Sequence, residues 1–170
     1  IEGTELRAER LMSSASASYG IQTLAALLRL LPERDPHEEI YRALLAIADH
    51  LDEPGVASAL IVRFELALLG ELGFGLDLSG CAAGEENSEL AYVSPKSGRA
   101  VSEKAGAPWR ERLLPLPAFL RGEARYSAAE ITAGFNLTGH FLARRVFEPR
   151  GLAMPEARAA LIAALAREAA

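Results

Sequence analysis

Segment 81–105, CAAGEENSELAYVSPKSGRAVSEKA, has the residue types and spacing of a metal-binding hairpin that has lost most of its ligands. Structural zinc generally takes four ligands, often as two cysteine pairs separated by a short hairpin, because tetrahedral thiolates clamp chain segments that lack a core of their own. Cys81 is the one cysteine in the sequence. A single thiol makes a poor zinc site, and the sequence therefore predicts that the hairpin holds no metal and that the chain has no cofactor.

The sequence lacks the motifs of the common catalytic classes. It contains no phosphate-binding loop, dinucleotide fingerprint, nucleophile elbow or His-Glu-x-x-His zinc helix. The histidines lie far apart, each without an acidic or thiol partner in a known motif: His37, His50 and His140. We interpret them as surface or helix-capping residues, and the sequence favours a protein that binds over one that catalyses.

One cysteine excludes an internal disulfide framework and suits a reducing compartment. No apolar run reaches the roughly 18 residues needed to cross a bilayer, and the start of the chain lacks the pattern of a signal peptide. These features predict a cytoplasmic location without membrane contact. The chain opens on Ile1 without a methionine, from which we expect a fragment or a processed chain.

Helical periodicity dominates residues 1–73. Apolar residues recur every three or four positions within residues 6–31, which predicts a first helix that Pro32 ends. A second helix is expected to begin at Asp35 and Pro36, with Glu38 completing a capping box. Pro54 opens a third helix that is apolar around nearly its whole circumference, and we expect this helix at the centre of the core.

A β-hairpin is predicted after the glycines that follow the third helix. Its strands are the short apolar runs 90–93 and 99–101, and the Pro and Gly of segment 94–98 supply the turn. Prolines in segment 109–120 permit only short helical turns. A capping box at residues 127–130 opens another helix that Pro149 and Gly151 stop, and a last helix begins at Pro155.

The expected fold class is mainly α: a single, helical bundle-like domain over residues 1–170 with one small inserted β-hairpin derived from a zinc knuckle. Helices occupy residues 1–73 and 106–170, and the degenerate hairpin occupies residues 74–105. No repeat of 20 to 50 residues is visible, which argues against a solenoid.

Three stretches in order, ELGFGLDLSGCAAG, AYVSPKSGRAVS and RLLPLPAFL, resemble the helical C-terminal part of the RecO recombination mediator family of bacterial DNA repair. That family carries one cysteine pair before a Tyr-x-Ser-Pro-x-x-Gly hairpin and a second pair after it. The resemblance places Cys81 at the first ligand position and Gly84, Ser102 and Ala105 at the other three. Cys81 is then a lone remnant, which we expect to be a buried small hydrophobe, while Tyr92 and Val93 hold the hairpin against the helices.

The resemblance implies a non-enzymatic function in DNA repair and homologous recombination. Proteins of this family bind single- and double-stranded DNA, anneal complementary strands, contact the C-terminal tail of single-strand-binding protein and RecR, and help to load RecA. An N-terminal oligonucleotide-binding barrel precedes the helical part in the family, and no matching run of alternating strands occurs in this sequence. The resemblance thus implies the C-terminal domain alone, in the cytoplasm and associated with the nucleoid.

Charge is unevenly distributed along the chain, whose net charge is −5. Residues 1–72 carry six basic and twelve acidic side chains, whereas residues 96–170 carry twelve basic and seven acidic ones. Because Lys and Arg contacts to phosphate dominate affinity for nucleic acids, the basic residues of the C-terminal half are the candidates for DNA contacts. The predicted nucleic-acid-binding residues are Lys96, Arg99, Lys104, Arg110, Arg112, Arg144 and Arg145.

Trp109 lies among these cations and offers either a face for base stacking or a side chain that fills the core, of which we favour the core. Other interpretations of the whole chain stay open. The basic residues fit solvated surfaces as well as a DNA track, in which case the chain is a helical scaffold or oligomerisation domain without DNA contact. A metal site completed in space by histidines or carboxylates is the third alternative.

Overall fold

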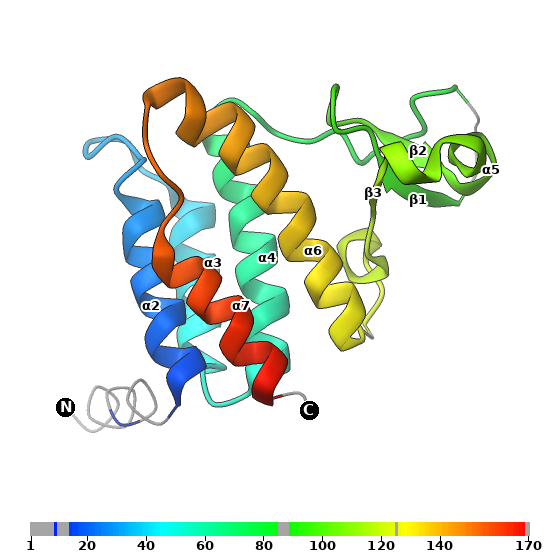
Figure 1. Ribbon diagram of the computed structural model, residues 1–170. Helices are drawn as coiled ribbons and strands as arrows, with labels where there is room; N and C mark the ends of the chain where they lie inside the picture. Colours follow the sequence, from blue (N-terminus) through cyan, green and yellow to red (C-terminus); the bar gives the residue numbers. More distant parts are fainter. Residues whose placement is uncertain (1–8, 10–13, 85–88, 125, 169–170) are drawn as a thin grey trace. The chain divides into compact units, whose positions relative to one another are not determined.

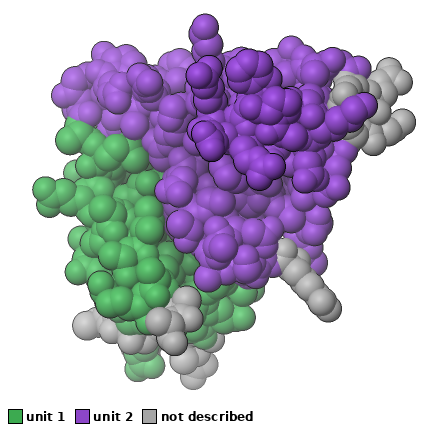
Figure 2. Space-filling model, turned by 45° about the vertical axis from the view of Figure 1, so that its right-hand side comes forward, with its two compact units in different colours: residues 1–67, 153–170 green, residues 68–152 purple. Residues whose placement is uncertain are grey.

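Helices dominate the computed structural model, which describes residues 9, 14–84, 89–124 and 126–168 (Figure 1). The chain divides into two compact units, which are described separately: unit 1 comprises residues 1–67 and 153–170, and unit 2 comprises residues 68–152 (Figure 2). The predicted fold class, mainly α with one small inserted hairpin, is confirmed. The prediction of one domain over the whole chain stays a prediction.

Unit 1 is built from helices. They are α2 (Ala15–Leu28), α3 (Glu38–Asp49), the larger part of α4 (Pro54–Glu71) and α7 (Glu156–Glu168). Helices α2 and α7, from opposite ends of the sequence, lie side by side (Figure 1). Ser14 begins α2 by accepting a hydrogen bond from the Ala17 N–H at 3.1 Å. The predicted first helix is thus confirmed for residues 15–28, and its earlier residues lie outside the described part apart from Glu9.

Helix α4 supplies much of the core of unit 1, as its all-round apolar character predicts. Among its fully buried side chains are Ile61, Val62 and Phe64. Glu65 is also fully buried, and its two carboxylate oxygens accept hydrogen bonds from the Arg158 guanidinium of α7 at 2.7 and 2.9 Å. A buried carboxylate is costly unless it is paired, and this bidentate pair explains how an acidic residue fits within an apolar helix.

The predicted start of α3 is wrong in its details. The helix begins at Glu38, and the capping position is occupied by His37, whose side chain makes no capping hydrogen bond. Asp35 and Pro36 therefore precede the cap, and Glu38 lies in the first turn rather than at the third helical position. Negative charge in a first turn still interacts favourably with the helix dipole, and Glu38 also pairs with Arg42 at 2.9 Å.

Unit 2 contains an antiparallel sheet with strand order β2-β1-β3. The predicted hairpin is present as β1 (Leu90–Val93) and β2 (Ala100–Ser102), with Val93 opposite Ala100. The third strand, β3 (Leu114–Pro115), was not predicted, because its proline argued for helical turns only. Pro115 is compatible with β3 because the strand lies at the edge of the sheet, where a missing N–H breaks no inner ladder.

The helical elements of unit 2 follow the sheet in short pieces before one longer helix. They are α5 (Glu103–Gly106), the 3₁₀ helices η1 (Ala107–Arg112) and η2 (Ala118–Arg121), α6 (Ala128–Phe141), the π-helical turn η3 (Leu142–Phe147) and the 3₁₀ turn η4 (Glu148–Arg150). The capping box predicted at the start of α6 is confirmed. Gly151, with φ of 65°, ends this run as predicted, whereas the π turn was not predicted. Within the described residues, none of the helices has the length and apolar character that crossing a membrane requires.

Candidate nucleic-acid interface around the hairpin

Hydrogen bonds join the residues at the positions where the family's metal ligands are expected. Cys81 is buried, and its sulfur accepts hydrogen bonds from the backbone N–H of Ser102 at 3.1 Å and of Ala83 at 3.4 Å. The Ser102 hydroxyl in turn accepts the Ala105 N–H at 3.1 Å and so caps α5. We call this set of contacts among Cys81, Ser102 and Ala105 the clasp. It links the segment before β1 directly to the end of β2.

The residues at the four expected ligand positions do not fit a structural zinc ion. Gly84 and Ala105 have no side-chain ligand atom, and the hydroxyl of Ser102 is engaged in capping α5. In the part of the chain that the structure describes, no group of three or more His, Cys, Asp or Glu side chains is placed to hold a metal. The predicted burial of Cys81 is confirmed, whereas its role as a hydrogen-bond acceptor was not predicted.

The sheet supports the elements that carry the predicted cations. Val93 and Ala100 are fully buried. Gly106, at the end of α5, lies so close to the ring of Tyr92 that a β-carbon at this position would overlap the ring. Tyr92 of β1 therefore fixes the end of α5, where η1 begins, against the sheet.

The turn of the hairpin is fixed at the opposite end. Gly98 has a φ of 73° and donates its N–H to the Ser94 carbonyl at 2.8 Å, and a ring nitrogen of His140 lies 3.1 Å from the Pro95 carbonyl oxygen. The Arg145 guanidinium lies 4.6 Å from the centre of the Phe141 ring, donates to the Phe74 carbonyl at 3.4 Å and lies against Gly98. Arg145 is thus half-buried and holds the turn against the π-helical segment.

The other predicted cations are exposed on the hairpin and on the segments that flank it. Lys96 lies in the turn, Arg99 lies directly before β2, and Arg144 is exposed on the π-helical segment. Lys104 follows β2 on α5, whereas η1, which carries Arg110 and Arg112, leads back toward the turn end of the sheet. This direction follows from the register, because Leu114 after η1 pairs with Val93 directly before the turn.

Arg99 has an acidic neighbour that reduces its local positive charge. Its Nε lies 3.6 Å from a carboxylate oxygen of Asp77. Hydrogen bonds from the side chain and backbone N–H of Ser79, with a smaller contribution from the charge of Arg99, hold the pKa of Asp77 below its ordinary value. Asp77 therefore stays ionised across the neutral range beside Arg99.

Trp109 does not fill the core, and this expectation was wrong. The side chain lies on η1 and is 57% exposed. The guanidinium carbon of Arg112 lies 5.9 Å from the centre of the indole ring. A hollow of about 550 Å³ lies over this turn and is lined by residues 107–112. Gly106, directly before this turn, lies against the ring of Tyr92, which is half-buried whereas Trp109 is exposed.

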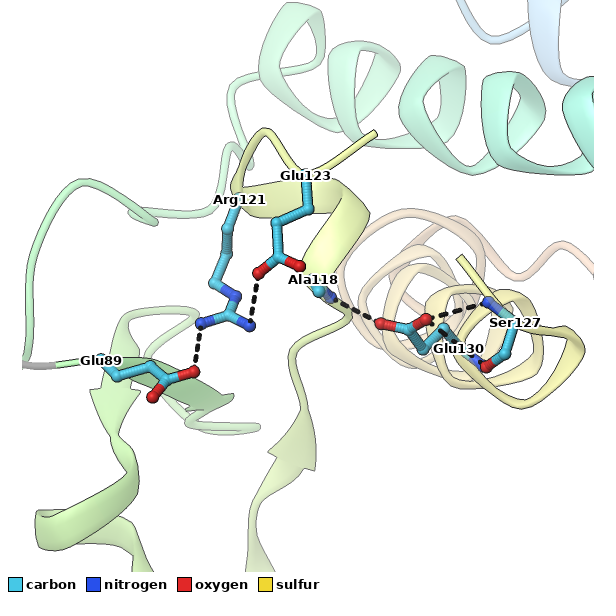
Figure 3. Close-up of polar contacts among 6 residues, drawn as sticks. All are labelled: Glu89, Ala118, Arg121, Glu123, Ser127 and Glu130. Carbon is cyan, nitrogen blue, oxygen red and sulfur yellow. Dashed lines mark hydrogen bonds and ion pairs between the residues drawn. The ribbon is translucent and has the colours of Figure 1, made fainter. Parts of the chain in front are cut away.

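Arg121 is a basic residue of unit 2 whose charge is engaged by neighbouring acids (Figure 3). Its guanidinium lies 3.4 Å from Glu89, directly before β1, and 3.3 Å from Glu123. Beside it, Glu130 accepts hydrogen bonds from the backbone N–H of Ser127 at 2.9 Å and of Ala118 at 3.1 Å. These two backbone hydrogen bonds, that of Ser127 first, lower the pKa of Glu130.

Comparison with known protein families identifies the class of the chain. The family model described as "Recombination protein O C terminal" matches residues 12–152. This match covers most of the chain and defines the C-terminal class of recombination proteins. With this match and the relatives below, the chain belongs to the RecO family of DNA repair proteins.

Similar proteins come from several bacteria and share the name "DNA repair protein RecO". The relative from Chelativorans sp. (strain BNC1) is 59% identical over 169 residues, which cover 98% of this chain and 68% of the relative. Those from Afipia carboxidovorans and Rhodopseudomonas palustris (strain TIE-1) are 58% and 56% identical, each over 98% of this chain and 69% of the relative. No solved structure gives a significant match to the chain.

Proposed function

We propose that this chain acts without catalysis in recombinational DNA repair, as the part of a recombination mediator that binds DNA through exposed basic residues of unit 2. Membership of the RecO family supports the role in repair and recombination. The observation that carries the DNA contact is the exposure of Lys and Arg side chains on the hairpin and on the helical segments that flank it. Cations at such positions neutralise phosphates and release counterions, which is the main source of affinity for nucleic acids.

The predicted contact residues differ in the role that their surroundings support. Lys96, Arg110 and Arg144 are exposed, and an approaching phosphate reaches them without displacing a packed side chain. Arg99 contacts phosphate in competition with Asp77. Arg145 lies against Phe141, Gly98 and the Phe74 carbonyl, and these contacts support a positioning role for it in addition to its charge.

Binding to the C-terminal tail of single-strand-binding protein and to RecR, strand annealing and RecA loading stay predictions that rest on the family resemblance. An acidic, hydrophobic tail suits a surface that presents arginine beside apolar side chains, because the charge-assisted pairs fix its carboxylates. Binding to both single and double strands, and a place on the nucleoid, belong to the same proposal.

A titration of fluorescently labelled single strand, followed by anisotropy at several salt concentrations, tests the DNA contact. The double variant Lys96→Ala/Arg99→Ala removes two exposed cations at the turn, and we expect weaker binding with a salt slope lowered by about 1.4, since each single-strand phosphate contact contributes about 0.7. The matched control is Arg29→Ala/Arg34→Ala, which removes two exposed cations from unit 1 and should leave both quantities unchanged.

Equal affinities and slopes for the two double variants would remove the hairpin turn from the interface. Failure of the unaltered chain to bind any DNA at low salt would favour the alternative of a helical scaffold or oligomerisation domain. Circular dichroism of each variant establishes that a loss of binding does not come from unfolding.

A further inference from the structure

Trp109 is exposed in a way that the packing of unit 2 does not require. Tryptophan is highly buried on average because its large ring stabilises a core. Here 57% of the side chain is exposed, although the turn that carries it rests against the sheet through Gly106 and Tyr92. The exposed Trp109 is therefore carried by a turn that packs against the sheet, and not by a loosely packed segment.

The turn around Trp109 is held at both ends. The Ala107 N–H donates to the Glu103 carbonyl, which joins η1 to α5, and the Leu113 N–H donates to the Arg110 carbonyl at 3.3 Å. Leu113 also lies near the position that a β-carbon on Gly106 would occupy. A ligand that contacts the indole thus meets a ring on a fixed backbone, which lowers the entropy cost of binding.

The chemistry around the indole combines an aromatic face with positive charge. Arg112 lies 5.9 Å from the ring centre, at the outer limit of a cation–π contact, and Arg110 is exposed on the same turn together with Glu111. Residues 107–112 border an open hollow at the surface of this turn, so a ligand can reach the ring and the guanidinium groups together. A planar, aromatic and anionic ligand fits this combination of a ring face and two guanidinium groups.

We propose that Trp109 is a base-stacking residue that makes this interface select unpaired over paired DNA, with Arg110 and Arg112 holding the adjacent phosphates. This inference rests on the proposed DNA-binding function and deepens it. In a single strand each base offers a free π face to the indole, whereas in a duplex the faces are covered by neighbouring bases. The basic residues contact the phosphates of single-stranded and duplex DNA alike, so the preference for single strands comes from Trp109.

The inference is tested by the fluorescence of the chain itself, because Trp109 is its one tryptophan. We expect an oligothymidine to quench this emission as it binds, since stacking places a base on the indole. A blunt-ended duplex hairpin, bound to the same extent by anisotropy, should leave the emission nearly unchanged. Equal quenching by both forms would overturn the selectivity.

Variants of the exposed aromatic residues separate stacking from general packing. Trp109→Ala should weaken single-strand binding roughly tenfold and leave duplex affinity unchanged, whereas Trp109→Phe, which keeps a ring, should retain most of the affinity. Tyr41→Ala is the matched control, because Tyr41 is a 63% exposed aromatic residue in unit 1, and it should change neither affinity.

The outcomes distinguish this inference from the proposed function. An oligonucleotide that binds without quenching, and with the same affinity for Trp109→Ala as for the unaltered chain, overturns the stacking role and leaves the DNA-binding function standing. Absence of binding to both single strand and duplex at low salt overturns the function and the inference together.

Discussion

At the scale of single residues, the clasp shows how hydrogen bonds can take over the task of a metal ligand. A thiolate in a zinc site commonly accepts backbone N–H groups as well as binding the ion. In this chain Cys81 keeps two such acceptor contacts, and the N–H of Ser102 comes from the strand that a second cysteine pair would otherwise tie to it. The hairpin therefore stays connected through N–H to sulfur contacts and a serine cap.

Cys81→Ala removes the acceptor of the clasp and leaves the buried Ser102 N–H without its sulfur. We expect a loss of about 1 to 3 kcal/mol in the free energy of unfolding, the usual cost of abandoning a buried donor. Urea denaturation measures it. Cys81→Ser keeps an acceptor and should lose less than the alanine variant. Equal stability of all three proteins, or stoichiometric zinc in the purified chain, would contradict the clasp.

The buried pair of Glu65 and Arg158 predicts a larger effect in unit 1. Arg158→Met should lower the free energy of unfolding by about 3 to 5 kcal/mol, because Glu65 then stays buried without its bidentate partner. Arg42→Met breaks the exposed pair with Glu38 and should cost only about 0.3 to 0.5 kcal/mol. Chemical denaturation of both variants measures the two losses of stability. Similar losses would show that burial does not determine how much an ion pair contributes to stability.

At the scale of elements, two similar capping signals had different outcomes. Ser127 and Glu130 form the predicted box, and Glu130 is held additionally by the Ala118 N–H of η2. The capping box predicted at Asp35 and Glu38 does not form, since α3 starts only at Glu38. The short-range pattern predicts that a helix begins in each region, whereas the exact first residue also depends on contacts from distant elements that the local sequence does not contain.

Glu130→Gln tests the charge in the box through its pH dependence. The pKa of Glu130 is lowered in the folded state, so its contribution to stability is present above its ordinary pKa of 4.5 and is lost as pH falls through the lowered folded value. The variant should be less stable than the unaltered chain at pH 7, and the difference should shrink below about pH 4.5. Thermal unfolding over this pH range, with the exposed-site variant Glu148→Gln as control, measures it; a difference independent of pH would contradict the assignment.

Alanine substitutions at two glycines should have opposite effects on the free energy of unfolding. Gly106→Ala places a β-carbon into the Tyr92 ring and should lower the free energy of unfolding by about 1 to 3 kcal/mol. Gly70→Ala adds a β-carbon in α4 with no atom within 4 Å and should raise it by up to about 1 kcal/mol. Denaturation curves check both values. A harmless Gly106→Ala would mean that Tyr92 does not fix the turn that carries Trp109.

The longer helices and the hairpin were predictable because their periods and turn residues are local properties of the sequence. The strand β3 was not, since Pro115 argues against a strand until its edge position is known. Trp109 was assigned to the core on its residue type, whereas the fold places it exposed on η1, which its local sequence does not indicate. The basic residues were readily identified, but the engagement of Arg145 with the Phe74 carbonyl is a property of the fold that the local sequence does not contain.

At the scale of the whole molecule, neither unit has a net positive charge, so the positive charge of the candidate interface comes from individual exposed residues. Unit 2 carries ten basic and ten acidic side chains, so the net charge of −5 lies in unit 1. Several acids of unit 2 are engaged: Asp77 with Arg99, Glu89 and Glu123 with Arg121. The proposed DNA binding would therefore depend on a few exposed cations around the hairpin, and we expect its affinity to be moderate and strongly dependent on salt.

The most direct test of the central claim is the salt dependence of single-strand affinity for the unaltered chain. Anisotropy titrations between about 50 and 200 mM salt give the slope of log affinity against log salt. Three to six phosphate contacts by the exposed cations predict a slope of about −2 to −4, at about −0.7 per contact. An affinity that does not change with salt, or no binding at the lowest salt, would contradict the claim that this hairpin-bearing unit contacts DNA.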